Sequence, residues 1–183
     1  MAARRSPSTE VLAKRHAQKV GDPSQGTSSG DTETMEKFLW NIISINSDFD
    51  EISFVWAQML EINTHQWMIL VAIKDLDRGG GVSVKGVSAL LHADPSFVTM
   101  HSKSLERNGF VRRVSSSEDA RIVLMSLTDK ACKKIAGLHS EQQSIRESIF
   151  AGLNDQELSD LNKKLSMLRE RFKRAAKRLA AEL

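Results

Sequence analysis

The residue pattern changes twice between residues 82 and 130, and this stretch constrains the fold more than any other part of the chain. Its first part repeats apolar residues every three to four positions, as amphipathic helices do. Its last part is rich in β-branched residues on either side of a polar turn, which is typical of a hairpin. Two helices followed by two strands are therefore expected in one short segment.

Capping residues set the limits of the two helices. Ser83 is a suitable N-cap for the first helix. Asp94 is a suitable N-cap for the second helix. Pro95 suits its first position, where the backbone N–H that proline lacks would have no partner within the helix. Asn108 and Gly109 tolerate the left-handed conformation of a C-cap and should end it.

Two strands are predicted next, at residues 110–114 and 121–127, with the serine-rich SSSEDA between them. The complete order is that of a winged helix-turn-helix, a module that reads duplex DNA. The expected fold class is mainly α with a small β-hairpin wing, an α/β winged-helix DNA-binding domain joined to a helical dimerisation region. Double-stranded DNA is the expected partner.

The second helix carries small, polar or basic groups opposite Val98 and Leu105, which we expect in the core. A major groove admits one helix, and basic residues at a wing tip suit the minor groove. Asp119 can fix the Arg121 guanidinium through a bidentate pair. The residues expected at the DNA are Ser96, Phe97, Thr99, Met100, Lys103, Ser104 and Arg107 on the second helix, Arg112, Arg113, Ser116, Asp119 and Arg121 in the wing, and Ser83 and Lys85 on the preceding helix.

The run DARIVLMSLT at residues 119–128 and the run LERNGFVRR at residues 105–113 resemble the MarR family of bacterial transcription regulators. In the family's helix order the resemblance covers residues 33–180. It implies a dimeric repressor that binds a palindromic operator and releases it when a small aromatic or phenolic ligand enters between the dimerisation and DNA-binding regions. Many relatives carry Arg at the positions of Met100 and Ser104, so base preferences cannot be transferred from them.

Apolar seams flank the winged module on both sides, with spacings that alternate between three and four residues. They form more apolar surface than one protomer should cover, so they predict a homodimer with interlocked terminal helices. The expected division is a flexible tail at residues 1–31 and a MarR-type domain at 32–183, with the winged module at 63–128 and the dimerisation region at 32–60 plus 129–183.

Further caps and glycines set the remaining boundaries. Thr64 is the expected N-cap of the helix before the module, and Thr128 that of a single helix after the wing. Asn154 and Glu157 form a capping box for the last helix. The triple glycine at residues 79–81 lacks the Lys-Ser/Thr of a phosphate loop, so we interpret it as a flexible connector.

Aromatic and methionine residues on the first two helices are candidates for the walls of a small-molecule cleft. Ordinary core packing is the alternative, since such residues at helical spacing usually fill a core. His65 can simply be a residue of the first helical turn. The candidate ligand-binding residues are Trp40, Ile43, Trp56, Met59, His65 and Met68.

Charge is segregated along the chain. Residues 32–77 contain eight acidic and two basic residues, whereas residues 163–182 contain eight basic and two acidic residues. Such segregation suits a protein that meets DNA on one face. The basic residues of the tail suggest either a disordered segment or an arm on phosphates.

The remaining function classes are limited by what the sequence lacks. The five histidines are dispersed, with no HExxH, Cys pair or GxSxG, so we predict no enzyme, metal site or cofactor. No apolar stretch suits a membrane span, and the single Cys132 indicates a reducing compartment, hence a cytoplasmic bacterial protein that is nucleoid-associated when bound to DNA. Cys132 is expected to be buried and inert. Two alternatives remain: an architectural or global DNA-binding protein without a ligand, and a thiol-based redox sensor through Cys132.

Overall fold

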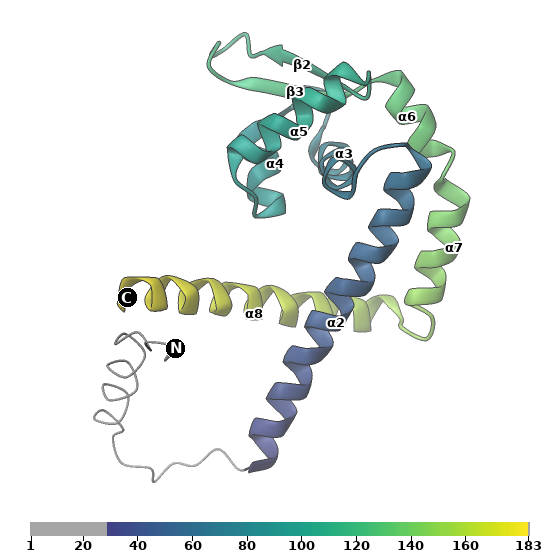
Figure 1. Ribbon diagram of the computed structural model, residues 1–183. Helices are drawn as coiled ribbons and strands as arrows, with labels where there is room; N and C mark the ends of the chain where they lie inside the picture. The colour runs from purple at the N-terminus through teal and green to yellow at the C-terminus, as the bar shows by residue number, and fades with distance from the viewer. Residues whose placement is uncertain (1–28, 183) are drawn as a thin grey trace, which may run out of the picture. The chain divides into compact units, whose positions relative to one another are not determined.

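The computed structural model describes residues 29–182, which fall into two compact units divided between Thr64 and His65 (Figure 1). The first unit holds the long helix α2 (Ser29–Met59). This helix begins within the stretch that the sequence assigned to the tail, and residues 1–28 lie outside the described part. The expected basic arm therefore lies there too.

Helix α2 exposes most of its large apolar side chains. Trp40 is 67% exposed and Ile45 is 62% exposed, whereas Ser53 and Ala57, nearer the C-terminal end, are buried. The apolar seam predicted from the sequence is thus present, and much of it faces solvent in a single chain.

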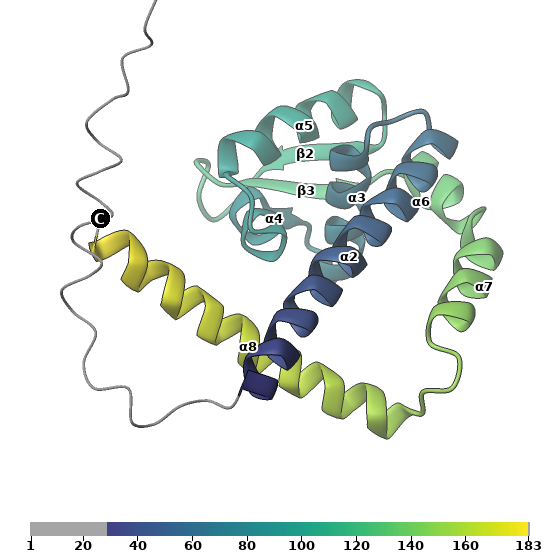
Figure 2. The ribbon, with the colours of Figure 1, turned by 60° about the horizontal axis from the view of Figure 1, so that its bottom comes forward.

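The second unit contains a winged helix, which confirms the predicted fold class. Its elements form a three-stranded antiparallel sheet in the order β1-β3-β2, with helices packed against it (Figure 2). The elements are α3 (Thr64–Leu76), β1 (Val82–Ser83), α4 (Val84–Leu91), α5 (Pro95–Arg107), β2 (Val111–Ser115) and β3 (Val123–Leu127).

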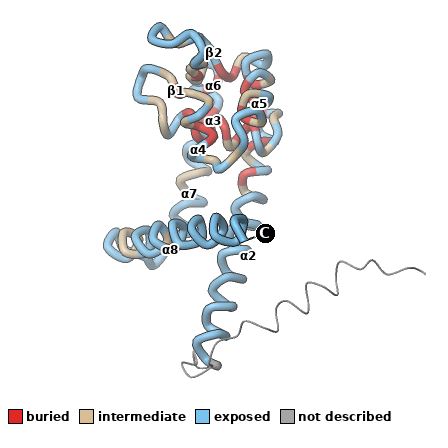
Figure 3. Tube along the Cα trace, turned by 90° about the vertical axis from the view of Figure 1, so that its left-hand side faces the viewer, coloured by how far each residue is buried: buried red, intermediate tan, exposed pale blue. Residues whose placement is uncertain are grey.

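The core of this unit is built from branched and apolar side chains of three helices and the sheet, which appear as buried segments in Figure 3. The predicted core residues Val98 and Leu105 of α5 are both fully buried. Burial of one such side chain contributes roughly 1.5–3 kcal/mol. Other buried residues of this unit include Ile69, Leu70, Ile73, Val87, Val111 and Met125. One face of α5 is thereby fixed to the unit, and the opposite face is left for solvent.

Strand β1 is not predicted from the sequence, because two residues are too short for a periodic signal. Val82 pairs with Met125 and Ser83 pairs with Leu124. The predicted connector at residues 79–81 forms a turn that the side chain of Asp77 holds. The Asp77 carboxylate accepts hydrogen bonds from the backbone N–H groups of Gly79, at 2.8 Å, and Gly81, at 2.9 Å.

The predicted caps of the winged module are confirmed, with one exception. The Ser83 hydroxyl accepts a 3.0 Å hydrogen bond from the Gly86 N–H, and Asp94 caps α5. Gly109 follows α5 with a φ of 72°. Thr64 is not an N-cap but the first residue of α3, because the helix begins one position earlier than its apolar pattern indicated.

The region after the wing contains three helices where the sequence predicted two. These are α6 (Asp129–Ala136), α7 (His139–Ile149) and α8 (Asp155–Glu182). The Thr128 hydroxyl caps α6 as expected, but Gly137, a poor helix former, ends it and separates it from α7. The capping box is confirmed, since Asn154 and Glu157 exchange hydrogen bonds at 2.9 and 3.0 Å.

Helices α7 and α8 have no buried residue along their described lengths. Large apolar side chains instead face solvent, among them Ile149 and Phe172, each 55% exposed. Across residues 29–182, no helix is both long enough and apolar enough to cross a membrane.

Candidate DNA-binding interface

Helix α5 is held by its buried face and by its N-cap. The Asp94 carboxylate accepts a 2.7 Å hydrogen bond from the Ser96 N–H. Hydrogen bonds from the Ser96 side chain, and then from its backbone, lower the pKa of Asp94 below its ordinary value. The Asp94 carboxylate therefore remains charged at neutral pH. Its negative charge interacts favourably with the positive end of the helix dipole.

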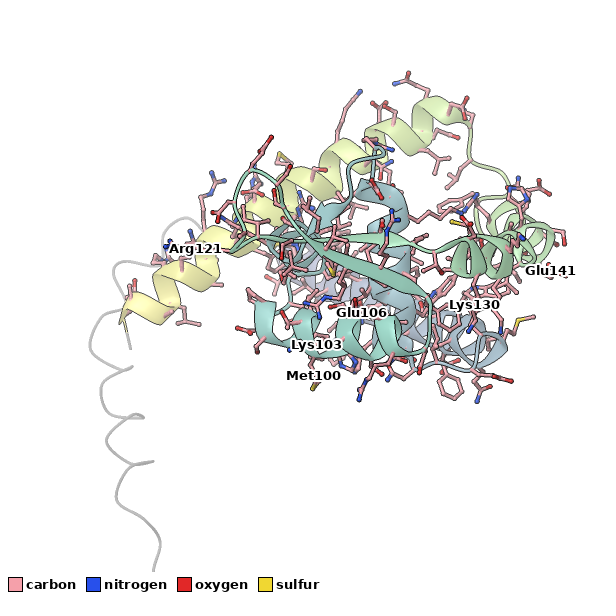
Figure 4. The ribbon with its side chains drawn as sticks, turned by 90° about the horizontal axis from the view of Figure 1, so that it is seen from above. Met100, Lys103, Glu106, Arg121, Lys130 and Glu141 are labelled. Atoms are coloured by element: carbon pink, nitrogen blue, oxygen red, sulfur yellow. The ribbon has the colours of Figure 1, made fainter. Side chains whose placement is uncertain are left out.

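The outer face of α5 carries several of the predicted DNA-contact residues. Ser96, Lys103 and Arg107 are exposed, Met100 is 58% exposed and Thr99 is half-buried. Figure 4 places Met100 and Lys103 on this helix and Arg121 on the hairpin. The exposed face therefore combines a hydroxyl, a flexible thioether and two cations.

Two other predicted contact residues of α5 are engaged by α3. Phe97 lies between two histidines, with ring centres 5.1 Å from His65 and 4.4 Å from His101. The Ser104 hydroxyl accepts a 3.0 Å hydrogen bond from the Gln66 side-chain amide. Both residues thus help to fix α5 against α3.

The hairpin orients the predicted wing residues. Arg112 and Arg121 are exposed, and the Ser116 hydroxyl accepts a hydrogen bond from the Glu118 N–H. The Arg113 Nε is buried without a hydrogen-bond partner among the described residues. Arg113 pairs with Met125 of β3, so the two side chains lie on the same face of the sheet, where Met125 is buried.

The predicted bidentate pair of Asp119 and Arg121 is wrong. Asp119 Oδ1 accepts a 2.9 Å hydrogen bond from the Arg121 backbone N–H, as in an Asx turn. The ion pairs of the described residues lie on α2 and α8 instead. The carboxylate therefore shapes the hairpin loop and leaves the guanidinium exposed.

The helix before α5 contributes one exposed cation. Lys85 is exposed on α4, whereas the Ser83 hydroxyl is occupied by its capping bond to Gly86. Of these two predicted residues, Lys85 has the freer side chain for a phosphate.

The candidate ligand-binding residues lie in both units. On α2, Trp40, Ile43 and Met59 are exposed and Trp56 is half-buried. His65 and Met68 lie on α3, where His65 joins Phe97 and His101. The contacts of this histidine within its own unit are thus with α5.

Sequence reasoning missed His101 as a partner of His65. Desolvation by burial, and then repulsion from His65, lower the pKa of His101 below its ordinary value of 6.5. Its position four residues after Phe97 places both rings on one face of α5, which was the available signal. The approach of His65 is a tertiary contact that no spacing reveals.

Cys132 on α6 is exposed, and the prediction of a buried thiol is wrong. The buried face of this short helix is supplied by Ala131 and Ile135, and Cys132 falls beside them on the solvent side.

The sequence of this chain is similar to those of known proteins. Residues 62–123 match the family model described as the MarR family. The chain is 30% identical over 76 residues to the uncharacterized HTH-type transcriptional regulator YdgJ of Bacillus subtilis (strain 168), a match over 42% of this chain and 46% of YdgJ. It is 24% identical over 119 residues to the HTH-type transcriptional repressor MdtR of the same organism, covering 63% of this chain and 75% of MdtR.

Solved structures agree in fold. A mutant MarR from E. coli complexed with operator DNA shows 20% identity and a TM-score of 0.60, over 74% of this chain and 95% of that one. The match to YdgJ spans less than half of that protein's length.

Proposed function

This chain belongs to the MarR family, and from that premise we propose that it is a DNA-binding transcription regulator. In this proposal α5 enters the major groove and the hairpin of β2 and β3 reaches the adjacent minor groove. The observation that carries it is the division of α5 into a fully buried face at Val98 and Leu105 and an exposed face at Lys103 and Arg107.

The exposed residues suit different parts of the groove. Ser96 and Thr99 lie in the N-terminal half of α5, where hydroxyls reach base edges, and Met100 can contact the methyl group of thymine. Lys103 and Arg107 lie further along, where cations meet phosphates. Phe97 and Ser104 act in this proposal by fixing the helix against α3.

The wing supplies the second contact. Arg121, at the end of the hairpin loop, suits the narrow and strongly negative minor groove, and Arg112 and Lys85 suit the flanking phosphates. Ser116 and Asp119 shape the loop through their hydrogen bonds to backbone N–H groups.

We further propose that the regulator is a homodimer. The exposed apolar side chains of α2, α7 and α8 would be buried between two copies. Two recognition helices related by a twofold axis would then lie about 34 Å apart and match a palindromic operator.

We also propose that the regulator is a repressor, and that a small molecule releases it from its operator. MdtR is named a repressor, and the candidate residues on α2 and α3 include exposed aromatic groups that suit an aromatic or phenolic ligand. Such a ligand must bind the DNA-incompetent form more tightly, so ligand and operator weaken each other equally.

Selection of duplexes from a random pool, followed by fluorescence anisotropy at several salt concentrations, tests the proposal. We expect enrichment of a palindrome and a linear fall of log affinity with log salt. Binding without sequence preference would favour the architectural alternative. A small aromatic acid that raises the Tm but leaves operator affinity unchanged would contradict release by a ligand.

A further inference from the structure

Two imidazole rings from distant parts of the chain face each other at the junction of α3 and α5. The ring centres of His65 and His101 are 5.4 Å apart, with an angle of 52° between their planes. His65 lies in the first turn of α3, and His101 lies in the middle of α5. Both belong to the winged-helix unit, so their spacing is set by one packed core.

The spacing of the rings matches the geometry of a shared metal ion. Imidazole nitrogens bind zinc at about 2.0–2.1 Å, and in a tetrahedral arrangement the centres of two such rings lie roughly 5 Å apart. The observed separation of the ring centres, 5.4 Å, is close to this value.

Access and protonation also suit a metal. His65 is exposed and His101 is half-buried, so an ion can reach the pair from solvent. Only a neutral imidazole binds a metal. Burial lowers the pKa of His101 below its ordinary value, which favours the neutral ring that a metal requires.

We propose that His65 and His101 together bind one divalent first-row transition ion, through one imidazole nitrogen of each ring. Imidazole suits Cu²⁺, Ni²⁺ and Zn²⁺, and the usual affinity order makes Cu²⁺ the strongest. No cluster of three or more His, Cys, Asp or Glu suited to a metal occurs within residues 29–182, so water fills the remaining positions. The site is open and weaker than a structural zinc site with four protein ligands.

The ion would join α3 to the recognition helix. Phe97 packs against both rings and the Gln66–Ser104 hydrogen bond lies on the same pair of helices, so the ion would add a third link to an existing contact. The consequence for DNA rests on the proposed function: a metal that fixes α5 changes operator affinity. Metal binding itself does not depend on that function.

Isothermal titration of the untagged full-length chain with NiCl₂, ZnCl₂ or CuSO₄ tests the site, with MgCl₂ as the oxygen-preferring control. We expect one transition ion per chain and a rise in Tm, because an ion that binds only the folded form stabilises it. Either His65→Gln or His101→Gln should lower the affinity by about 10-fold or more, since loss of a group that merely orients a metal ligand already costs that much.

Matched controls separate this site from other ligands. His16→Gln, His139→Gln and Cys132→Ser each remove one alternative ligand and should leave the affinity unchanged. His65 is exposed, so His65→Gln keeps the test valid if His101→Gln disturbs folding. Unchanged affinity in His65→Gln and His101→Gln, or loss of binding only in a control variant, overturns the proposal.

Discussion

The side-chain amide of Gln66 donates a 3.0 Å hydrogen bond to the Ser104 hydroxyl, across the contact between α3 and α5. Gln66 is only 6% exposed, and Ser104 is half-buried on the recognition helix. Ser104 therefore helps to hold α5 against α3.

Ser104→Ala should destabilise the winged module. The variant removes the acceptor of a partly buried hydrogen bond, which lowers the free energy of unfolding by about 1–2 kcal/mol. Urea denaturation measures the change. The exposed hairpin residue Ser117 provides the control, and Ser117→Ala should have almost no effect. Equal stability of the two variants would show that the bond does not fix α5.

Stability should fall as the pH is lowered below the ordinary histidine pKa of 6.5, because of His101. Its pKa is lowered in the folded protein, so the unfolded chain binds a proton more readily. The stabilisation is complete above the ordinary pKa of 6.5 and is lost as the pH falls through the folded pKa. His101→Gln should flatten the dependence of Tm on pH in this window, whereas His139→Gln should leave it unchanged. A slope that persists in His101→Gln would assign it to other groups.

The turn before β1 should accept a side chain at one glycine and not at another. Gly81 has a φ of 77°, and a Cβ there would lie 3.3 Å from the Leu124 Cβ and from the Met125 carbonyl oxygen. Gly81→Ala should cost about 1 kcal/mol or more, because alanine is strained at positive φ. Gly80 has no such φ and nothing within 4 Å of a built Cβ. Gly80→Ala should be neutral or stabilising, and thermal unfolding of both variants gives the comparison.

Lys103→Ala and Arg107→Ala should weaken DNA binding uniformly across sequences. Each removes one phosphate contact in the proposed complex, so the slope of log affinity against log salt should fall by about 0.9. Anisotropy titrations at several salt concentrations measure the slope. Lys74→Ala, on α3, is the control and should retain it. A changed sequence preference with an unchanged slope would place these side chains at base edges.

The sequence predicted those structural features that depend on residues only a few positions apart. The capping box of Asn154 and Glu157 and the cap at Ser83 were both confirmed, because each needs only a short-range backbone partner. Strand β1 and the pairing of His65 with His101 depend on segments that meet only in the folded unit. Cys132 was misplaced because its burial was inferred from its residue type, whereas the apolar pattern of α6 correctly puts Ala131 and Ile135 on the buried face.

Phe172→Glu should dissociate the proposed homodimer. Phe172 is 55% exposed in the single chain. It belongs to the apolar seam predicted for α8, which consists of Leu158, Leu161, Leu165, Leu168, Phe172, Ala175 and Leu179. Burial of a phenylalanine contributes about 1.5–3 kcal/mol, and a twofold interface contains the residue twice. The dimer dissociation constant should therefore rise by roughly 100-fold or more, as measured by analytical ultracentrifugation.

The matched control for Phe172→Glu is Ala181→Glu, which adds the same charge to the exposed opposite face of α8, nine residues and two and a half turns after Phe172. This variant should remain dimeric, and operator affinity should fall only for Phe172→Glu, because a single winged module binds DNA weakly. A wild-type chain that sediments as a monomer, or equal dissociation of the two variants, would contradict the proposed use of this seam.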